Sequence, residues 1–180
     1  SYTMNYILAV ILGIGSVMGS TAFAHGPTPQ KAEETIIIAA PPDAVWAVLK
    51  DFAGVAGWNT ALKASKGEGG NTAGATRSIT LKNDGQLEEG LDEVNEAEKY
   101  VGYRLSKENV EVFPVSFYSA TISVKADGDG SLVTWSGRFY RGDTSNFPPD
   151  NLNDEAALNA MTEFFKQGLA GLKAKLEAKG

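Results

Sequence analysis

Residues 153–179 read NDEAALNAMTEFFKQGLAGLKAKLEAK. At 100° per residue, the apolar side chains of this stretch gather in one arc less than about 90° wide, which is the pattern of a helix that packs one face on a core. The members of this stripe are Leu158, Met161, Phe165, Leu169, Leu172 and Leu176. At 1.5 Å per residue the helix would be about 39 Å long, enough to cross a small domain. We therefore expect the rest of the chain to be arranged around it.

Both ends of this predicted helix carry suitable signals. Asn153 is a candidate N-cap, acidic residues follow it, and lysines gather near the C-terminal end, which is the charge order that the helix dipole favours. Two glycines interrupt the helix, each at a cost of roughly 1 kcal/mol relative to alanine. One of them, Gly168, lies at the edge of the apolar stripe. We expect another segment to approach the helix there, and a cavity beside it.

The composition describes one globular domain. With 180 residues, of which 43% are hydrophobic, the chain is long enough to bury a core. The sequence has no cysteine and one histidine, which excludes disulfides and thiolate sites and argues against histidine-based catalysis or zinc binding. The net charge of −6 argues against a surface that binds nucleic acid or an anionic membrane. The sequence therefore predicts no metal and no cofactor.

Residues 1–24 have the pattern of a secretory signal peptide. Residues 7–17 form an apolar run too short to span a bilayer, and Ala22-Phe23-Ala24 matches a signal peptidase site. No Lys or Arg precedes the apolar run, and a membrane anchor that stays attached is the alternative. Cleavage would leave His25 at the N-terminus of an exported protein without cysteine. The sequence therefore predicts a periplasmic protein with no stable membrane insertion after cleavage.

Between the signal peptide and the long helix, the hydrophobic period changes to two, the period of strands. Residues 25–34 are predicted to be an extended leader and residues 35–40 the first strand, followed by a short helix from Pro42 or Asp43 and a second short helix or turn near Trp58. Further strands are predicted at residues 61–66, 75–81, 86–95, 100–107, 115–125 and 132–140. Strands segregated from one amphipathic helix predict an α+β fold, in which a curved antiparallel sheet packs its apolar face on the helix.

Short motifs occur in a recognisable order along the chain. They are Ala40-Pro41-Pro42-Asp43-Ala44-Val45-Trp46, then Trp58-Asn59, Glu89-Gly90-Leu91, Tyr118 and Gly130-Ser131-Leu132-Val133-Thr134-Trp135. With the order of elements, they resemble the helix-grip fold of the START/Bet v 1-like (SRPBCC) superfamily, in particular its polyketide cyclase/dehydrase-like branch. The resemblance covers about residues 33–179. It implies a helix-grip domain at residues 35–180, with a sheet of about six to seven strands wrapped around the C-terminal helix, two short helices after the first strand, and a cavity that binds hydrophobic molecules.

A narrower resemblance rests on the leader. An exported member of this superfamily that begins His-Gly-Pro-Thr-Pro-Gln-Lys, residues 25–31, resembles the MxaD group of periplasmic accessory proteins of bacterial methanol oxidation. That resemblance implies a periplasmic dehydrogenase or a cytochrome as partner. The acidic run within residues 88–98 is most simply a solvated strand and turn, and it is also where a basic partner would bind.

The alternation of apolar residues identifies the inner face of the predicted sheet. In the hairpin around Asp84 the apolar members of this face are Ile79, Leu81, Leu87 and Leu91. Residues that lie opposite each other in a hairpin must be on the same face of the sheet. A three-residue loop at residues 83–85 meets this condition for the apolar residues of the inner face. It places Ile79 opposite Glu89 and Gly85 at the left-handed position of the loop. Two charged residues, Arg77 and Glu89, then lie on the inner face at diagonal positions.

Charges on an apolar inner face are informative because charged residues are rarely buried without a partner. Arg77 and Glu89 are either a structural ion pair near a cavity mouth or groups that orient a ligand, unless the register is wrong. Glu89 with Tyr118 or Tyr103 could also serve as general acid and base. The aromatic residues are most simply core, with Trp58 the best exception because mobile glycines surround it. The predicted cavity residues are Trp58, Arg77, Ile79, Glu89, Leu91, Tyr103, Tyr118, Ala120, Trp135, Phe139, Met161, Phe165 and Gly168.

Three functions from different classes compete. The resemblance to helix-grip proteins favours an exported protein that binds a small hydrophobic molecule with one polar end in a cavity between the C-terminal helix and the sheet. The alternatives are a periplasmic accessory protein that assists a methanol dehydrogenase–cytochrome system, and a polyketide cyclase/dehydratase-like enzyme. The fold alone does not choose among them, and no catalytic residue is assigned.

Overall fold

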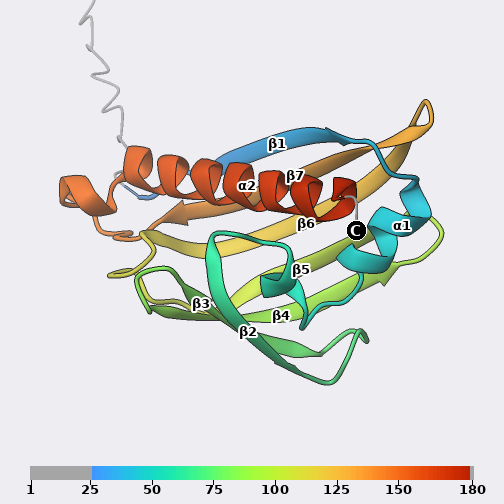
Figure 1. Cartoon of the computed structure of the whole chain (residues 1–180). Helices are drawn as coiled ribbons and strands as arrows, with labels where there is room; N and C mark the ends of the chain where they lie inside the picture. Colours follow the sequence, from blue (N-terminus) through green and yellow to red (C-terminus); the bar gives the residue numbers. More distant parts are fainter. Residues whose placement is uncertain (1–25, 179–180) are drawn as a thin grey trace, which may run out of the picture.

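The computed structural model describes residues 26–178, so the predicted signal peptide lies outside the described part of the chain. Its elements in chain order are β1 (Gln30–Ile38), α1 (Pro42–Leu49), the 3-10 helix η1 (Val55–Gly57), β2 (Leu62–Glu68), β3 (Thr76–Leu81), β4 (Gln86–Asn95), β5 (Tyr100–Lys107), β6 (Val115–Asp127), β7 (Gly130–Arg141), the 3-10 helix η2 (Asp150–Leu152) and α2 (Asp154–Glu177). Figure 1 shows one curved sheet with α2 lying along it. Within residues 26–178, no helix is both long and apolar enough to cross a membrane.

The sheet has seven strands in the order β1-β7-β6-β5-β4-β3-β2, and all neighbours are antiparallel. The strands from β2 to β7 follow one another as a meander, and β1 joins the far side of β7. Inner residues alternate with solvated ones, as on β6, where Tyr118, Ala120 and Ile122 are buried. The predicted helix-grip architecture is confirmed, with α1 and η1 as the two short helices after the first strand.

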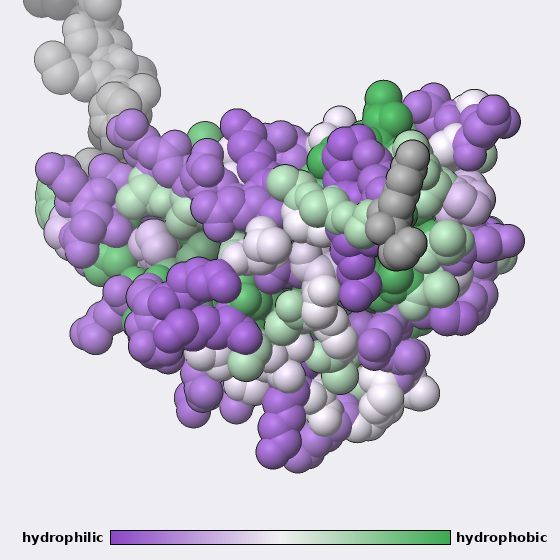
Figure 2. Space-filling model, in the orientation of Figure 1, coloured by the Kyte–Doolittle hydropathy of each residue, from purple (hydrophilic) through white to green (hydrophobic). Residues whose placement is uncertain are grey.

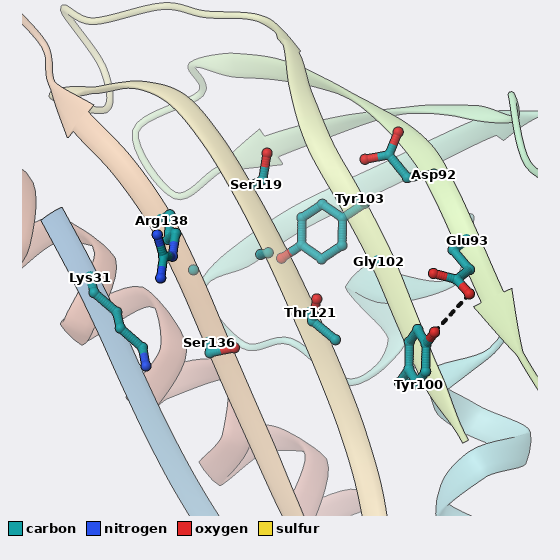
Figure 3. Close-up of a pocket in the computed structure, with 12 residues that line it drawn as sticks. Lys31, Asp92, Glu93, Tyr100, Gly102, Tyr103, Ser119, Thr121, Ser136 and Arg138 are labelled. Atoms are coloured by element: carbon teal, nitrogen blue, oxygen red, sulfur yellow. Dashed lines mark hydrogen bonds between the residues drawn. The ribbon is translucent and has the colours of Figure 1, made fainter. Parts of the chain in front are cut away.

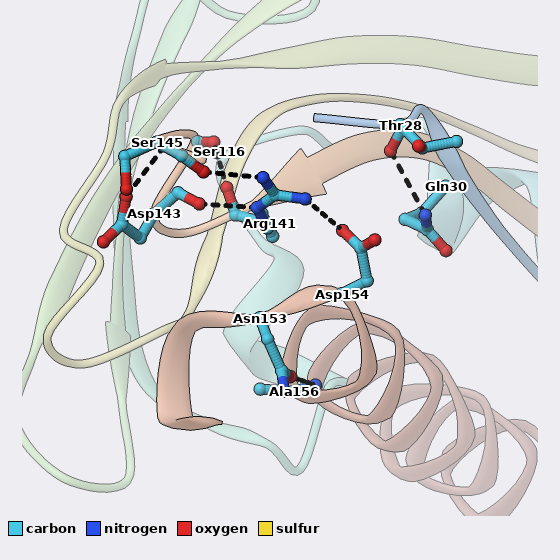
Figure 4. Close-up of polar contacts among 9 residues, drawn as sticks. All are labelled: Thr28, Gln30, Ser116, Arg141, Asp143, Ser145, Asn153, Asp154 and Ala156. Atoms are coloured by element: carbon cyan, nitrogen blue, oxygen red, sulfur yellow. Dashed lines mark hydrogen bonds and ion pairs between the residues drawn. The ribbon is translucent and has the colours of Figure 1, made fainter. Parts of the chain in front are cut away.

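The long helix α2 begins where the sequence predicts. The side chain of its N-cap, Asn153, accepts a hydrogen bond from the Ala156 amide at 2.9 Å (Figure 4). The middle of the predicted stripe is buried: Met161, Phe165, Leu169 and Leu172. Leu158 departs from it with 38% exposure, and Ala157 is the buried residue of that turn. The first turns of α2 lie at one end of the molecule, where less of the sheet covers them (Figure 1).

A buried arginine ties the end of β7 to the start of α2. Arg141, 7% exposed, lies with its Nη1 3.4 Å from Asp154 Oδ1. Its Nε and Nη2 donate to the backbone carbonyls of Asp143 and Ser145, each at 2.7 Å (Figure 4). These bonds offset the cost of burying the guanidinium, and they hold the polar loop that turns α2 back over the sheet.

The predicted start of the first strand is wrong. β1 begins at Gln30, which pairs with Phe139 of β7, whereas the sequence placed an extended leader at residues 25–34 and the strand at 35–40. The early part of β1 is polar on its solvated side and has one small inward residue, Ala32, which is 4% exposed. An edge strand with one solvated face can form without a run of β-branched residues. The strand pattern in this part of the sequence is therefore weak.

The predicted register of the β3–β4 hairpin is also wrong, by two residues. Arg77 lies directly opposite Glu89 rather than diagonal to it. The left-handed residue of the turn is Asp84, with φ 68°, because aspartate tolerates this conformation. Gly85 serves another purpose, since a Cβ there would lie 2.4 Å from the Val112 side chain. A shift of two residues preserves the face of every side chain, so the predicted inner set is correct.

Candidate functional site

A polar network lies among apolar side chains between α2 and the sheet. The side chains of Arg77 on β3 and Glu89 on β4 are 7% and 2% exposed. Arg77 Nε donates to Glu89 Oε1 at 2.7 Å. The Tyr118 hydroxyl, on β6, donates to the other carboxylate oxygen at 2.5 Å. Each carboxylate oxygen therefore has a partner, which offsets the cost of removing its charge from water.

Two aromatic rings enclose the Arg77 guanidinium. Its Cζ lies 4.0 Å from the ring centroid of Phe52 and 4.8 Å from that of Tyr103, distances at which cation–π attraction operates. Arg77 Nη1 also donates to the Phe52 carbonyl at 2.9 Å. Phe52 lies between α1 and η1, and its amide donates to Asn71 Oδ1 at 2.9 Å. The segment before η1 thus closes over the arginine and removes it from solvent.

The two interior tyrosines are neutral at physiological pH. Burial, followed by the negative charge of Glu89, raises the pKa of Tyr103 and of Tyr118 well above the usual range of a phenol. The Tyr103 hydroxyl accepts a hydrogen bond from Trp135 Nε1 at 3.0 Å. The network therefore consists of one ion pair and two phenols that keep their protons.

The empty space beside the network is small. Its volume is about 10 Å³, room for at most one water molecule. The residues around it are Leu87, Glu89, Tyr103, Phe113, Tyr118, Met161, Phe164 and Phe165. Aromatic rings fill the rest of the interior. The ring centroid of Trp135 lies 4.5 Å from that of Phe165, in a stacked arrangement, and 5.8 Å from that of Phe164. Side chains cover the gap that the ribbons leave between α2 and the strands (Figure 2).

Every predicted cavity residue is buried. Those that border the small cavity are Glu89, Tyr103, Tyr118, Met161 and Phe165. The others pack around it without bordering it: Trp58, Arg77, Ile79, Leu91, Ala120, Trp135, Phe139 and Gly168. Alternation of residues placed these side chains on the correct face, but it carried no information on which of them enclose empty space.

The cavity predicted beside Gly168 is absent, because a neighbouring segment fills that place. A Cβ at Gly168 would lie 2.7 Å from Trp135 Cζ3 and 3.1 Å from the Asn59 amide group. A Cβ at Gly171 would lie 2.2 Å from the Trp58 carbonyl oxygen. Both glycines therefore let the segment after η1 dock on α2, as the predicted close approach requires. Asn59 Nδ2 is buried there without a hydrogen-bond partner among the described residues.

Three aromatic residues of the site were missed by the sequence, and Leu87, predicted only as an inner-face residue, also borders the cavity. Phe52 covers Arg77, while Phe113 and Phe164 close one side of the interior with ring centroids 5.7 Å apart. Phe52 and Phe113 lie in irregular segments, where no periodicity indicates which way a side chain points. Phe164 precedes Phe165 on α2 and falls outside the predicted stripe. An aromatic residue next to a stripe is the one signal that could have identified it.

The network can hold the polar end of a ligand. A guanidinium, a carboxylate and a phenol together can donate to or accept from a hydroxyl or carbonyl group, and Glu89 can accept a proton. Each carboxylate oxygen could accept a second hydrogen bond, but the space beside the network holds at most one water molecule. Binding therefore requires the surrounding aromatic side chains to move.

Known structures share this architecture. The protein XoxI from Bacillus cereus is 26% identical, with a TM-score of 0.68 over 81% of this chain and 94% of that chain. The Zhui aromatase/cyclase from Streptomyces sp. R1128 is 17% identical, with a TM-score of 0.67 over 83% of this chain and 94% of that chain. Norcoclaurine synthase from Thalictrum flavum is 15% identical, with a TM-score of 0.62 over 86% and 98% of the two chains. The last two show similarity of fold alone.

Sequence comparison agrees with the structural likeness. No curated protein matches the chain. The model of the family described as polyketide cyclase / dehydrase and lipid transport matches residues 29–177, which span β1 to the end of α2. The superfamily predicted from the motifs is thereby confirmed, while the narrower likeness to the MxaD group stays a prediction. The chain belongs to the polyketide cyclase/dehydrase and lipid transport family.

Proposed function

We propose that this protein binds a small hydrophobic molecule with one polar end in the interior between α2 and the sheet. The observation that carries the proposal is the network of Arg77, Glu89 and Tyr118, a group of polar side chains that faces an aromatic-lined core. Apolar walls with a few convergent polar groups are the usual composition of a small-molecule site. A ligand would place its apolar body among the rings and its polar end on the network.

Ligand entry needs a seam that opens, because the interior is filled. One seam runs where the loop before β6 meets α2, at the rings of Phe113 and Phe164. The same loop is held to the β3–β4 turn by one exposed hydrogen bond, from Asn83 Nδ2 to the Val112 carbonyl at 3.1 Å. A loop held by few exposed bonds opens at low free energy. We expect the ligand to enter at this seam.

The test uses native mass spectrometry and a fluorescent probe. The purified protein, exposed to a mixed cell extract, should retain a small molecule, and that molecule should displace 8-anilinonaphthalene-1-sulfonate. Phe113→Ala should admit the probe more readily and lower its Kd about tenfold. The matched control is Phe117→Ala on β6, because that aromatic ring is 67% exposed and lies away from the interior. No retained molecule, together with equal probe binding in both variants, would refute the proposal.

An enzymatic role would use the same residues. Glu89 would act as the proton acceptor and Tyr118 as its hydrogen-bonding partner, a pairing that their contact permits. If the protein turns over a polyketide-like substrate, Glu89→Gln and Tyr118→Phe should each lower the rate by about 100-fold or more. Unchanged turnover in both variants would leave binding as the function.

A role as an exported accessory protein is the second candidate. The observation that favours it is the acidic rim of β4 and the following turn, where Glu88, Glu93, Glu96 and Glu98 are exposed and could meet a basic partner. The proposal includes export by cleavage before His25, followed by contact with a periplasmic dehydrogenase or its cytochrome. Intact-mass measurement of the exported product tests the cleavage. Neighbouring genes for a quinoprotein dehydrogenase and a cytochrome would support the partnership, and their absence would remove it.

A further inference from the structure

The face of the sheet opposite α2 carries a hollow of about 410 Å³. This volume lies within the range of small-molecule sites. Alternate residues of a strand face opposite sides, so the hollow is lined mainly by outward side chains, and the buried Tyr103 and Ala120 also border it. On β6, for example, the side chains of Ser119 and Thr121 lie in the hollow, while Ala120 between them is 4% exposed (Figure 3).

The floor of the hollow is made of small residues in one row. Gly102, Thr121 and Ser136 lie side by side on β5, β6 and β7. A Cβ at Gly102 would meet only ordinary contacts, at 3.9 Å and 4.0 Å, so packing does not demand a glycine there. Because Gly102 has no side chain, the hollow is deeper at this position. The hydroxyl groups of Thr121 and Ser136 can each donate and accept a hydrogen bond.

One end of the hollow holds two cations side by side. Lys31 on β1 and Arg138 on β7 are directly paired, and both side chains lie beside Ser136 at this end (Figure 3). Like charges in such a position repel each other. Within residues 26–178 no carboxylate lies within ion-pair distance of Arg138, while Lys31 is 3.7 Å from Glu33 in an exposed pair. In a chain of net charge −6, Arg138 without a carboxylate partner, beside a lysine that has only an exposed one, points to a bound anion.

The other end has the opposite character. Tyr100 donates its hydroxyl hydrogen to Glu93 Oε1 at 2.7 Å, and the second carboxylate oxygen, which has no donor among residues 26–178, faces the hollow (Figure 3). A register shift between Leu91 and Glu93 adds Asp92 to the same end, where Arg104 neutralises it at 2.7 Å. These groups accept hydrogen bonds and repel a second anion.

We propose that this hollow, termed the outer site, binds a small hydroxylated carboxylic acid with a single negative charge. Its carboxylate would lie between Lys31 and Arg138, and its hydroxyl groups would bond to Thr121, Ser136 and Glu93. One anionic end and a neutral, hydrogen-bonding remainder match the charges at the two ends of the hollow. The outer site lies on the face of the sheet away from α2, and Tyr103 borders both it and the small interior cavity.

The test is an NMR titration of the ¹⁵N-labelled protein with gluconate as probe. Gluconate should shift the amide signals of Gly102, Thr121 and Ser136 in a saturable way. Arg138→Gln should weaken its affinity at least tenfold, whereas Lys66→Gln, an exposed lysine on β2, should leave it unchanged. Acetate lacks the hydroxyl groups and glucose lacks the carboxylate. Each should bind at least tenfold more weakly than gluconate.

Two results would overturn the outer site. One is the absence of saturable shifts on the floor, or equal gluconate affinity in the protein and in Arg138→Gln. The other is acetate binding as tightly as gluconate, which would reduce the site to simple ion pairing. Phe113→Ala, which alters only the interior, should leave gluconate binding unchanged, so failure of the interior proposal would be seen separately.

Discussion

Glu89 is the residue whose surroundings are most sharply defined. It is 2% exposed, and its two oxygens are bonded to Arg77 and Tyr118. Burying an ion pair gives little net stability, because the loss of hydration offsets the attraction. Removing one partner is different, because it leaves a buried charge without compensation. The network is therefore a sensitive point for stability, whatever it binds.

The first prediction concerns this network. Glu89→Ala should lower the free energy of unfolding by about 3–5 kcal/mol, because Arg77 stays buried without its counter-ion. The triple variant Arg77→Met, Glu89→Leu, Tyr118→Phe removes the ion pair and the phenol bonded to it together, and it should be less destabilised than Glu89→Ala alone. Urea unfolding followed by circular dichroism measures both. If the triple variant were the less stable one, the polar network would contribute net stability.

The second prediction concerns alkaline pH. Burial raises the pKa of Tyr103 and Tyr118 in the folded protein, whereas phenols of the unfolded chain ionise near pH 10. Their contribution to stability is complete below pH 10 and is lost as pH rises above it, by about 1.4 kcal/mol per pH unit for each phenol. Unfolding by urea between pH 9 and 11.5 measures the slope. Tyr118→Phe should remove about half of it, and an unchanged slope would contradict the assignment.

At the scale of elements, the two glycines of α2 contribute to its packing alongside its apolar stripe. Gly168 and Gly171 leave room for Trp135, Asn59 and the Trp58 backbone against the helix surface. Glycine weakens an isolated helix by roughly 1 kcal/mol relative to alanine. The close approach that it permits brings the segment after η1 onto the helix and closes the core.

The third prediction follows from this packing. Gly168→Ala should destabilise the protein by about 1–3 kcal/mol, because overlap with Trp135 outweighs the gain in helix propensity. The matched control is Gly90→Ala on β4, where a Cβ would meet no atom within 4 Å. Thermal unfolding compares the two. A higher Tm in Gly168→Ala would show that Trp135 moves aside at little cost.

The fourth prediction concerns the start of α2. Asn153→Ala removes the side chain that accepts from the Ala156 amide and should lower stability by about 1 kcal/mol. Asn153→Asp keeps an acceptor and should restore most of that loss. Asn151→Ala, an exposed position in η2, serves as the control. A loss in Asn151→Ala equal to that in Asn153→Ala would contradict the capping role.

At the scale of the whole molecule, one sheet separates two environments. Its inner face meets α2 and is filled by aromatic rings, while its outer face is solvated and holds the polar hollow. The interior depends on β1 being complete, because β1 is an edge strand that pairs only with β7 within the sheet. The part of β1 before Thr35 contributes the buried Ala32 and its pairing with β7.

The fifth prediction uses that dependence. A chain starting at His25 should have a higher Tm than one starting at Thr35. The shorter chain loses several strand-pairing hydrogen bonds, each worth about 1 kcal/mol net. The expected decrease in Tm is about 5–10 °C, from about 2–4 °C per kcal/mol for a chain of this length. Equal Tm values would mean that the first half of β1 contributes nothing to stability.

Features that depend on residues close together in the sequence could be predicted from it. The period of α2 and its cap, the inner and outer faces of the strands, and the burial of Arg77 and Glu89 follow from 3.6- and 2-residue repeats. The start of β1 could not be read, because a polar edge strand resembles an extended leader. The hairpin register was off by two residues, because Asp84 took the conformation expected of Gly85.

The residue repeats and the order of elements were enough to predict a curved sheet packed on a long helix, and the inner face of each strand. What those side chains enclose depends on contacts between segments far apart in the chain. Phe52, Phe113 and Phe164 reach the interior from loops and from the flank of α2, so the cavity shrinks to about 10 Å³ and Gly168 meets Trp135 instead of empty space. The physical reason is that periodicity fixes the direction of a side chain, whereas the volume left over depends on how distant segments pack together.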